Sequence, residues 1–279
     1  MKSIFNIMPD FLRDPDAFFE SIRDGKDVRA KALTLVVTAI LCLMAYGFTV
    51  GLAKSPLQAL SSALKMPVLF LLTMAFCLPS LYFFSLTLLR TPLSMLQVQT
   101  VVLAGISVTA FLLLGLAPIS LFFVLTSSNY PFFQLMAVLF VGASAVIGVY
   151  FLWRGMTLVD ISGQATQRRM GQRILMLWFV LYAFVGTQMT WRLSPFIGRP
   201  EDPFYPLKPS RDNFYVDVVH AVQGALNLSP AQVPWLTPLL LAGMCLLGLG
   251  GMIFFGGLFF GKTAGKGAGS QAAANPSAG

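Results

Sequence analysis

The stretch VVLAGISVTAFLLLGLAPISLFFVL, residues 101–125, decides the fold of this chain. It contains no charged side chain, and about 20 mostly apolar residues are enough for a helix to cross a bilayer. A spanning segment must satisfy its backbone hydrogen bonds without water, and a helix does so within one segment. A transmembrane strand would be shorter and would alternate polar with apolar residues. Residues 101–125 therefore predict a membrane-spanning helix.

The rest of the chain has the same character. Its 279 residues are 56% hydrophobic and 11% charged, with a mean hydropathy of +0.75, whereas soluble domains carry about 25% charged residues. The charge-free runs predict six spans, at 32–53, 67–89, 101–125, 134–153, 174–191 and 235–260. The sequence therefore predicts an all-α, polytopic integral membrane helical bundle of about six transmembrane helices.

Most of the Lys and Arg residues fall in segments that would share one side of the membrane with the N-terminus. The positive-inside rule then places both termini in the cytoplasm. The expected order is a cytoplasmic segment 1–31, a five-span bundle 32–191, an external segment 192–234, a sixth span 235–260 and a cytoplasmic tail 261–279. The first external connection would hold Lys54 and Lys65. The tail is mainly Gly, Ala and Ser, which predicts disorder.

Two short segments outside the spans predict amphipathic helices. Asp14 and Pro15 form a helix start, with a capping acid followed by proline at the first helical position. The next residues place Phe18, Phe19 and Ile22 on one face, which predicts a helix on the cytoplasmic membrane surface, or alternatively one packed on the cytoplasmic loops.

The second amphipathic helix is expected in the external segment. In the stretch NFYVDVVHAVQGALN, residues 213–227, apolar residues recur at helical spacing. This places Val218 and Val219 on one side of a helix and His220 and Gln223 on the other. This pattern predicts a helix lying on the outer membrane surface.

The external segment opens with WRLSPFIGRPEDPFYPLKPSRDNFY, residues 191–215. Its prolines restrict the backbone to extended geometry and predict an ordered loop. Arginine and aromatic residues dominate energetic hot spots of interfaces, so we expect a partner-binding surface here. Its residues are Trp191, Arg192, Pro195, Phe196, Gly198, Arg199, Arg211, Asn213 and Phe214. The alternatives are a rigid lid over the helix ends, or a site for a small molecule or lipid headgroup.

The last predicted span carries a stripe of glycines. Gly243, Gly250 and Gly257 recur every seven residues, and Gly257 with Gly261 forms a GxxxG motif. These spacings predict close approach of a neighbouring helix, either in this chain or in another subunit, including a possible homo-oligomer.

No constellation for catalysis is visible. The chain has one histidine, no metal-type cluster, no phosphate-binding glycine loop and no GxSxG motif, so we expect no enzymatic activity, metal or cofactor. Its acidic residues all lie outside the predicted spans, which disfavours an ion-driven carrier. The basic residues are spread over both sides of the membrane, so nucleic acid is not an expected partner.

Two parts of the chain resemble known families. MPDFLRDPDAFFESIRDG, residues 8–25, and the proline-punctuated spans after Pro67 resemble the bacterial branch of the Yip (Ypt-interacting protein) family. That resemblance implies a cytoplasmic N-terminus, about five clustered membrane helices and a location in the bacterial cytoplasmic (inner) membrane. VGTQMTWRLSPFIGRPEDPF, residues 185–204, with RDNFY, residues 211–215, is similar to a pattern of uncharacterised bacterial polytopic proteins.

Two functions are compatible with these observations. The first is a non-enzymatic membrane scaffold or accessory subunit, whose partners are membrane lipids and other membrane or extracytoplasmic subunits. The second is a transporter or scramblase for a lipid or other hydrophobic substrate, which would use a path between helices kinked at Pro79 and Pro118.

Overall fold

A computed structural model describes residues 11, 13–87, 93–126, 130–159, 165–198, 203–207, 214–225 and 238. For residues 85–87, 165–171, 214, 215, 217 and 225 it describes the backbone alone. The regular elements within these ranges are all helices: α2 (Pro15–Arg23), α3 (Val28–Gly51), α4 (Pro56–Thr87), α5 (Met95–Thr126), α6 (Tyr130–Val159), α7 (Ala165–Leu193) and α8 (Phe214–Ala225). The prediction of an all-α fold is confirmed for this part of the chain.

Five helices are long and apolar enough to cross a membrane. They are Val28–Gly51, Pro56–Phe84, Met95–Thr126, Tyr130–Val159 and Gln172–Leu193. Many of their large side chains, such as Leu125 and Leu139, are exposed, as expected for helices surrounded by lipid. The protein is therefore a multi-pass helical membrane protein. The predicted sixth span 235–260 and tail 261–279 lie outside the described residues, as do Gly243, Gly250, Gly257 and Gly261.

The largest departure from the predicted boundaries is the start of α4. The charge-free run begins at residue 67, but the helix begins at Pro56. Pro67 therefore lies inside the helix, and Lys65 belongs to a span rather than to an external connection. A charge-free run marks only the part of a helix without charged side chains. It misses the first turns of α4, because their polar side chains form hydrogen bonds with other parts of the protein.

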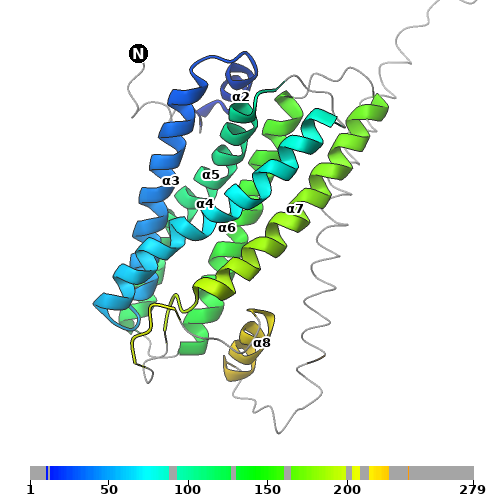
Figure 1. Cartoon of the computed structure of the whole chain (residues 1–279). Coiled ribbons are helices and arrows are strands. Elements are labelled where there is room, and N and C mark those ends of the chain that lie inside the picture. The colour runs from blue at the N-terminus through cyan, green and yellow to red at the C-terminus, as the bar shows by residue number, and fades with distance from the viewer. Residues whose placement is uncertain are drawn as a thin grey trace, which may run out of the picture. The chain divides into compact units, whose positions relative to one another are not determined.

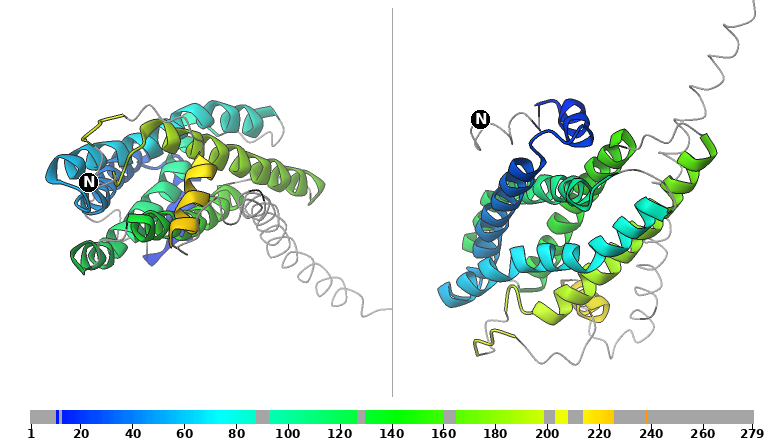
Figure 2. Two further views of the ribbon diagram at one scale, coloured as in Figure 1. Left: turned by 90° about the horizontal axis from the view of Figure 1, so that it is seen from below. Right: turned by 45° about the horizontal axis from the view of Figure 1, so that its top comes forward.

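The spans form a folded row. α3 packs on both α4 and α5, α5 packs on α6, and α4 packs on α7, whereas α6 and α7 have little contact with each other. Figures 1 and 2 show the consequence, with α4 and α7 running together and α5 and α6 forming the opposite wall. Among the helices that the structure describes, the row is closed at α3 and open between α6 and α7.

The core of the row is the first half of α5. All residues from Val101 to Ala110 are buried, so this helix is surrounded by protein along three turns. One of its few polar groups, the Ser107 hydroxyl, donates to the Leu35 carbonyl of α3 at 3.0 Å. Beyond this stretch Phe111 and Phe122 are exposed. The quoted segment 101–125 is thus half core and half lipid-facing.

α2 forms as predicted but covers protein. The Asp14 carboxylate caps the helix by accepting from the Ala17 N–H at 3.2 Å. Its apolar side chains Phe18, Phe19 and Ile22 are buried, and α2 packs on α6 and α5. The face that was predicted to enter the membrane surface therefore packs on α5 and α6, and not on the cytoplasmic loops that the alternative interpretation named.

Polar contacts fix α2 to both helices. Arg154 of α6 donates to both carboxylate oxygens of Asp16, at 2.7 and 2.6 Å. Gln97 at the start of α5 donates to the Ile22 and Arg23 carbonyls at 2.7 and 3.0 Å. α2 thereby clamps α5 and α6 together at one end of the bundle, called the α2 end below.

α8 lies at the opposite end, called the α8 end, where it packs mainly on α6 and less on α7. Val218, Val219 and Ala221 are buried and His220 is exposed, as the predicted amphipathic pattern requires. Gln223 departs from that pattern, because it is buried on the side that packs against protein.

Candidate functional site

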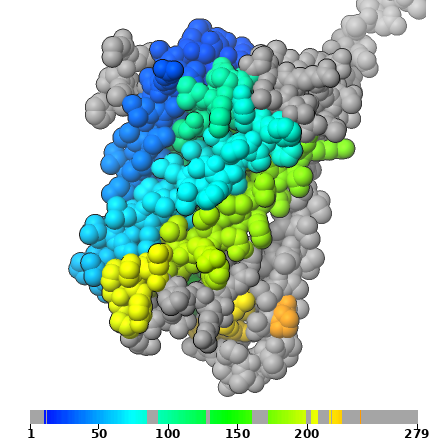
Figure 3. Space-filling view, viewed as in Figure 1, coloured from blue at the N-terminus to red at the C-terminus, as the bar shows by residue number. Residues whose placement is uncertain are grey.

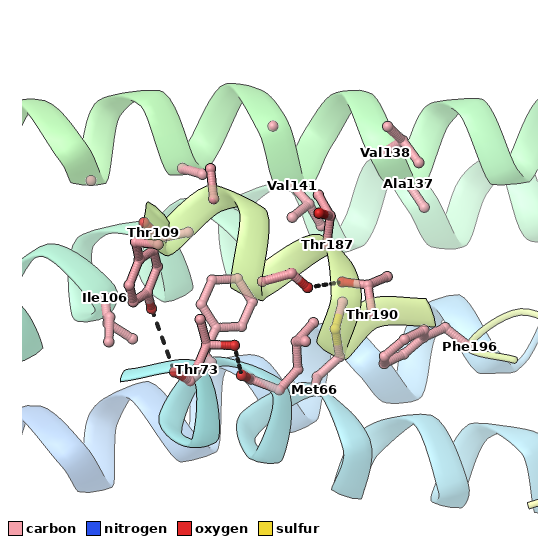
Figure 4. Close-up of a pocket in the computed structure, with 18 of the residues that line it drawn as sticks. Met66, Thr73, Ile106, Thr109, Ala137, Val138, Val141, Thr187, Thr190 and Phe196 are labelled. Carbon is pink, nitrogen blue, oxygen red and sulfur yellow. Dashed lines mark hydrogen bonds between the residues drawn. The ribbon is translucent and has the colours of Figure 1, made fainter. Parts of the chain in front are cut away.

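A cavity of about 440 Å³ lies between the wall formed by α4 and α7 and the wall formed by α5 and α6 (Figure 4). Its volume falls within the roughly 300–1,000 Å³ of pockets that bind small molecules. The described residues that line it include no Asp, Glu, Lys, Arg or His. The bundle therefore contains an uncharged, mainly apolar hollow on its open side.

Aromatic side chains of α7 form one wall of the cavity. The buried Trp178 indole N–H donates to the Cys77 carbonyl of α4 at 3.0 Å, and its ring lies 5.3 Å from the Tyr182 ring. The Tyr182 hydroxyl reaches the Phe70 carbonyl, also on α4, at 3.5 Å. These contacts hold α7 on α4, and the Trp178 and Tyr182 side chains that make them also line the cavity.

Two glycines extend the cavity to the helix backbones. A Cβ added at Gly186 of α7 would meet only the Thr73 Cγ2 atom, at an ordinary contact distance of 3.8 Å. A Cβ added at Gly142 of α6 would meet nothing within 4 Å. Both residues line the cavity, so space for side chains exists at these positions and is not filled.

The polar groups of the walls are mostly hydroxyls with their hydrogens already engaged. Thr73 donates to Leu69 O at 2.7 Å and Thr190 donates to Gly186 O at 2.8 Å (Figure 4). Bonded in this way to their own helices, these side chains offer the cavity methyl groups and weak acceptors. An apolar ligand would meet no unpaired donor from them.

Residues 194–198, called the cap segment below, close the α8 end of the cavity. Ser194, Pro195, Phe196 and Ile197 line it. The Pro195 carbonyl accepts from Gln58 and Lys65 of α4, and Figure 3 shows the yellow residues that follow α7 beside the end of α3 and α4. The cap segment therefore separates part of the cavity from the α4 surface behind it.

Three side chains of α4 hold the cap segment. Gln58 donates to the Pro195 and Phe196 carbonyls at 2.8 and 3.1 Å, and Lys65 donates to the Pro195 carbonyl at 2.9 Å. The Ser62 hydroxyl also donates to the Phe196 carbonyl. Positions 58, 62 and 65 lie on one face of a helix. We call Gln58, Ser62 and Lys65 the α4 donor cluster.

Gly198 ends the cap segment with a turn. Its φ of +72° is in the left-handed region, which favours glycine. A Cβ here would lie 2.6 Å from the Cδ atom of Lys54, while the Lys54 ammonium donates to the Pro203 carbonyl at 3.2 Å. A side chain at position 198 would therefore disturb how the loop packs on Lys54.

The structure brings only part of the predicted partner-binding set together. Trp191 lines the cavity at the end of α7, and its buried indole N–H has no hydrogen-bond partner among the described residues. The guanidinium of Arg192 is exposed and lies 4.8 Å from the Trp191 ring centre. Pro195, Phe196 and Gly198 belong to the cap segment.

The remaining predicted residues are not placed. Phe214 begins α8, and its side chain is not described. Arg199, Arg211 and Asn213 lie outside the described residues. The Pro195 and Phe196 carbonyls of the cap segment accept from α4, and both the lid and the partner-binding surface stay predictions.

The sequence analysis missed the α4 donor cluster because it assigned residues 58–65 to a connection. The available signal was the spacing of Gln58, Ser62 and Lys65, which places three polar residues on one helix face.

The GxxxG pair Gly47 and Gly51 of α3 was also missed. A Cβ at either glycine would lie 2.5–2.6 Å from the α4 backbone, so this pair allows α3 and α4 to approach closely.

Comparison of the chain with protein-family models, with curated proteins and with solved structures found no match. Within the described ranges, no group of three or more His, Cys, Asp or Glu side chains is placed to hold a metal ion. The site is therefore defined by its own geometry, as an apolar cavity inside a membrane bundle with a polar cluster at one end.

Proposed function

We propose that this protein binds a lipid or another hydrophobic substrate in the interhelical cavity and, without acting as an enzyme, transports or scrambles it between the leaflets. The observation that carries this proposal is the uncharged cavity of about 440 Å³ on the open side of the bundle. Burying a charged ligand among such walls would be costly, whereas an apolar chain gains from leaving water.

The position of the cavity supports access from the membrane. α6 and α7 have little contact with each other, so a chain that enters between them disrupts few interactions. The opposite side of the row is held by extensive packing of α3 on α4 and α5. Substrate exchange therefore requires movement at one helix pair and not throughout the bundle.

A scaffold or accessory subunit, the first function favoured by the sequence, stays a prediction. It relies on the external segment as a docking surface. The Pro195 and Phe196 carbonyls of that segment are engaged with α4, and Arg199 and Arg211 lie outside the described residues. The geometry therefore supports the cavity more directly than a partner surface.

A cavity-filling substitution tests the proposal. Gly186→Phe places a ring in the cavity without a backbone clash, because a Cβ at this position has ordinary contacts. Gly115→Phe is the matched control, since Gly115 also has open space, is exposed and does not line the cavity. We expect Gly186→Phe to lose co-purifying lipid and to slow the flux of a fluorescent lipid in vesicles, while Gly115→Phe behaves as the parent.

Two results would argue against the proposal. One is a folded Gly186→Phe protein that retains bound lipid and flux at the parent level. The other is a stoichiometric protein partner that co-purifies in mild detergent and is lost when residues 196–211 are altered, because this would favour the scaffold.

A further inference from the structure

Lys65 is a cation in an unusual place. It lies inside α4, whose segment Pro56–Phe84 is long and apolar enough to cross a membrane, and its side chain is buried, with 8% exposed. A charged side chain at membrane depth is costly and usually has a function. Among the described residues no carboxylate forms an ion pair with it. Its partners there are the Pro195 carbonyl at 2.9 Å and the Phe196 ring, whose centre lies 5.9 Å from the ammonium nitrogen.

The α4 donor cluster converges on two oxygens. The Gln58 amide, the Ser62 hydroxyl and the Lys65 ammonium all donate to the Pro195 and Phe196 carbonyls. Several donors with one cation, aimed at neighbouring oxygens, are also what binds an oxyanion. A peptide carbonyl carries only a partial negative charge, so within the described part of the chain no full negative charge neutralises Lys65.

The cluster and the cavity share the cap segment. Pro195 and Phe196 accept from the cluster and also line the cavity. Met66, the neighbour of Lys65 in the chain, lines the same end, where Figure 4 shows it near Phe196. A ligand with oxygens at the cluster would therefore have its apolar part in the cavity.

We propose that the ligand is an anionic phospholipid, with phosphate oxygens replacing the Pro195 and Phe196 carbonyls at Gln58, Ser62 and Lys65 and one acyl chain in the cavity. This assignment rests on the proposed function of the cavity. The phosphate brings a full negative charge to Lys65. A zwitterionic lipid would bring its own cation close to Lys65, so the site selects for a net negative headgroup.

Headgroup preference is the measurement that tests this assignment. The full-length protein in detergent is incubated with equal amounts of phosphatidylglycerol and phosphatidylethanolamine, and the bound lipids are identified by mass spectrometry. We expect the parent to prefer phosphatidylglycerol about tenfold, because the ammonium group of phosphatidylethanolamine repels the Lys65 ammonium. Lys65→Gln should bring the two lipids to near parity at unchanged total lipid, and Lys65→Arg should keep the preference.

Lys54→Gln is the matched control, because Lys54 is a lysine at the same end of the bundle, lies outside the α4 donor cluster and donates to the Pro203 carbonyl. It should keep the parent's preference. If Lys65→Gln does not fold, Ser62→Ala gives a second reading, since it removes one donor and leaves the charge. It should weaken the binding of both lipids severalfold and keep the preference, because both lipids carry the phosphate.

The outcomes separate the two proposals. A parent protein that binds no lipid, with no difference in Gly186→Phe, overturns the proposed function itself. Bound lipid with no headgroup preference, with a preference unchanged in Lys65→Gln, or with an affinity unchanged in Ser62→Ala, overturns only the anionic-lipid assignment. Displacement of phosphatidylglycerol by an equal concentration of inorganic phosphate would assign the cluster to a soluble phosphate and overturn the lipid source.

Discussion

The two sides of α6 show how similar apolar helices can meet or stay apart. Against α5, a Cβ added at Gly148 would lie 2.6 Å from the Gly105 carbonyl oxygen, so the two backbones are in contact. On the cavity side, Gly142 faces open space, and a Cβ at Gly186 of α7 would meet only Thr73 of α4, at an ordinary contact distance. A glycine therefore draws helices together only where the facing helix also presents a small residue at the same level.

Attachments elsewhere explain why one side is sealed and the other is open. The Thr109 hydroxyl reaches the Ser144 carbonyl of α6 at 3.4 Å, adding a polar contact to the Gly105–Gly148 crossing. α7 instead uses the Trp178 indole to bond to α4. At the sealed crossing Gly105 and Gly148 face each other, whereas α6 and α7 meet through the rings of Trp153 and Phe179, whose centres lie 6.4 Å apart.

Removing the clamp over the sealed pair should have the largest effect. The Phe19 ring is fully buried, and a Cβ at Gly155 of α6 would lie 2.5 Å from it. Phe19→Ala should lower the free energy of unfolding by about 3–5 kcal/mol, the usual cost of emptying a buried aromatic site. Denaturant unfolding in detergent measures this loss. Phe111→Ala, at an exposed position of α5, is the control, and an equal loss there would contradict a clamp role for α2.

Opening the sealed pair directly should cost less. Gly148→Ala puts a methyl group against the Gly105 backbone, and overpacking of this kind costs about 1–3 kcal/mol. Thermal unfolding monitored by size-exclusion chromatography reports the shift. Gly142→Ala, on the same helix but facing the cavity, should not lower stability. If both variants lost stability equally, the contrast between the two sides of α6 would be wrong.

The open side should respond with the opposite sign. Gly186→Ala has room for its methyl group, and replacing glycine within a helix gains about 0.5–1 kcal/mol. The same thermal assay should therefore show a higher melting temperature. A fall in melting temperature would mean that the space around position 186 is too small for a methyl group.

The smallest effect is expected at the surface of the clamp. The Asp16 and Arg154 side chains are 44% and 40% exposed, and exposed ion pairs contribute about 0.2–1 kcal/mol. Asp16→Asn should lose no more than this, and the loss should shrink at high salt. Glu20→Gln, at an exposed position on the same helix, is the comparison. A loss as large as that of Phe19→Ala would place the clamp's stability in this ion pair instead of in its apolar face.

Sequence reasoning was most successful where the signal is local. The runs 101–125 and 134–153 lie within α5 and α6, because a charge-free apolar run leaves few alternatives to a span. Asp14 and Pro15 likewise marked the start of α2. The surface that covers Phe19 could not be predicted, since an amphipathic face is equally suited to lipid and to another helix.

The candidate site was less accessible to such reasoning. Lys65 and Pro67 interrupt the apolar run of α4, so the first turns of this helix were assigned to a connection and the donor cluster was lost. Pro195, Phe196 and Gly198 were chosen for their proline and aromatic chemistry. Their actual contacts are made through backbone carbonyls, which every residue possesses and which no side-chain pattern distinguishes.

By itself, the sequence determined that this chain is a helical membrane protein and where most of its spans run, because hydropathy and the need to satisfy backbone hydrogen bonds act within one segment. Only the tertiary structure decided that Gly105 faces Gly148, that Gly186 lines a cavity and that Lys65 donates to the cap segment. These features depend on the shapes of side chains that are distant in sequence, and the cavity exists because α7 is bonded to α4 and not packed on α6.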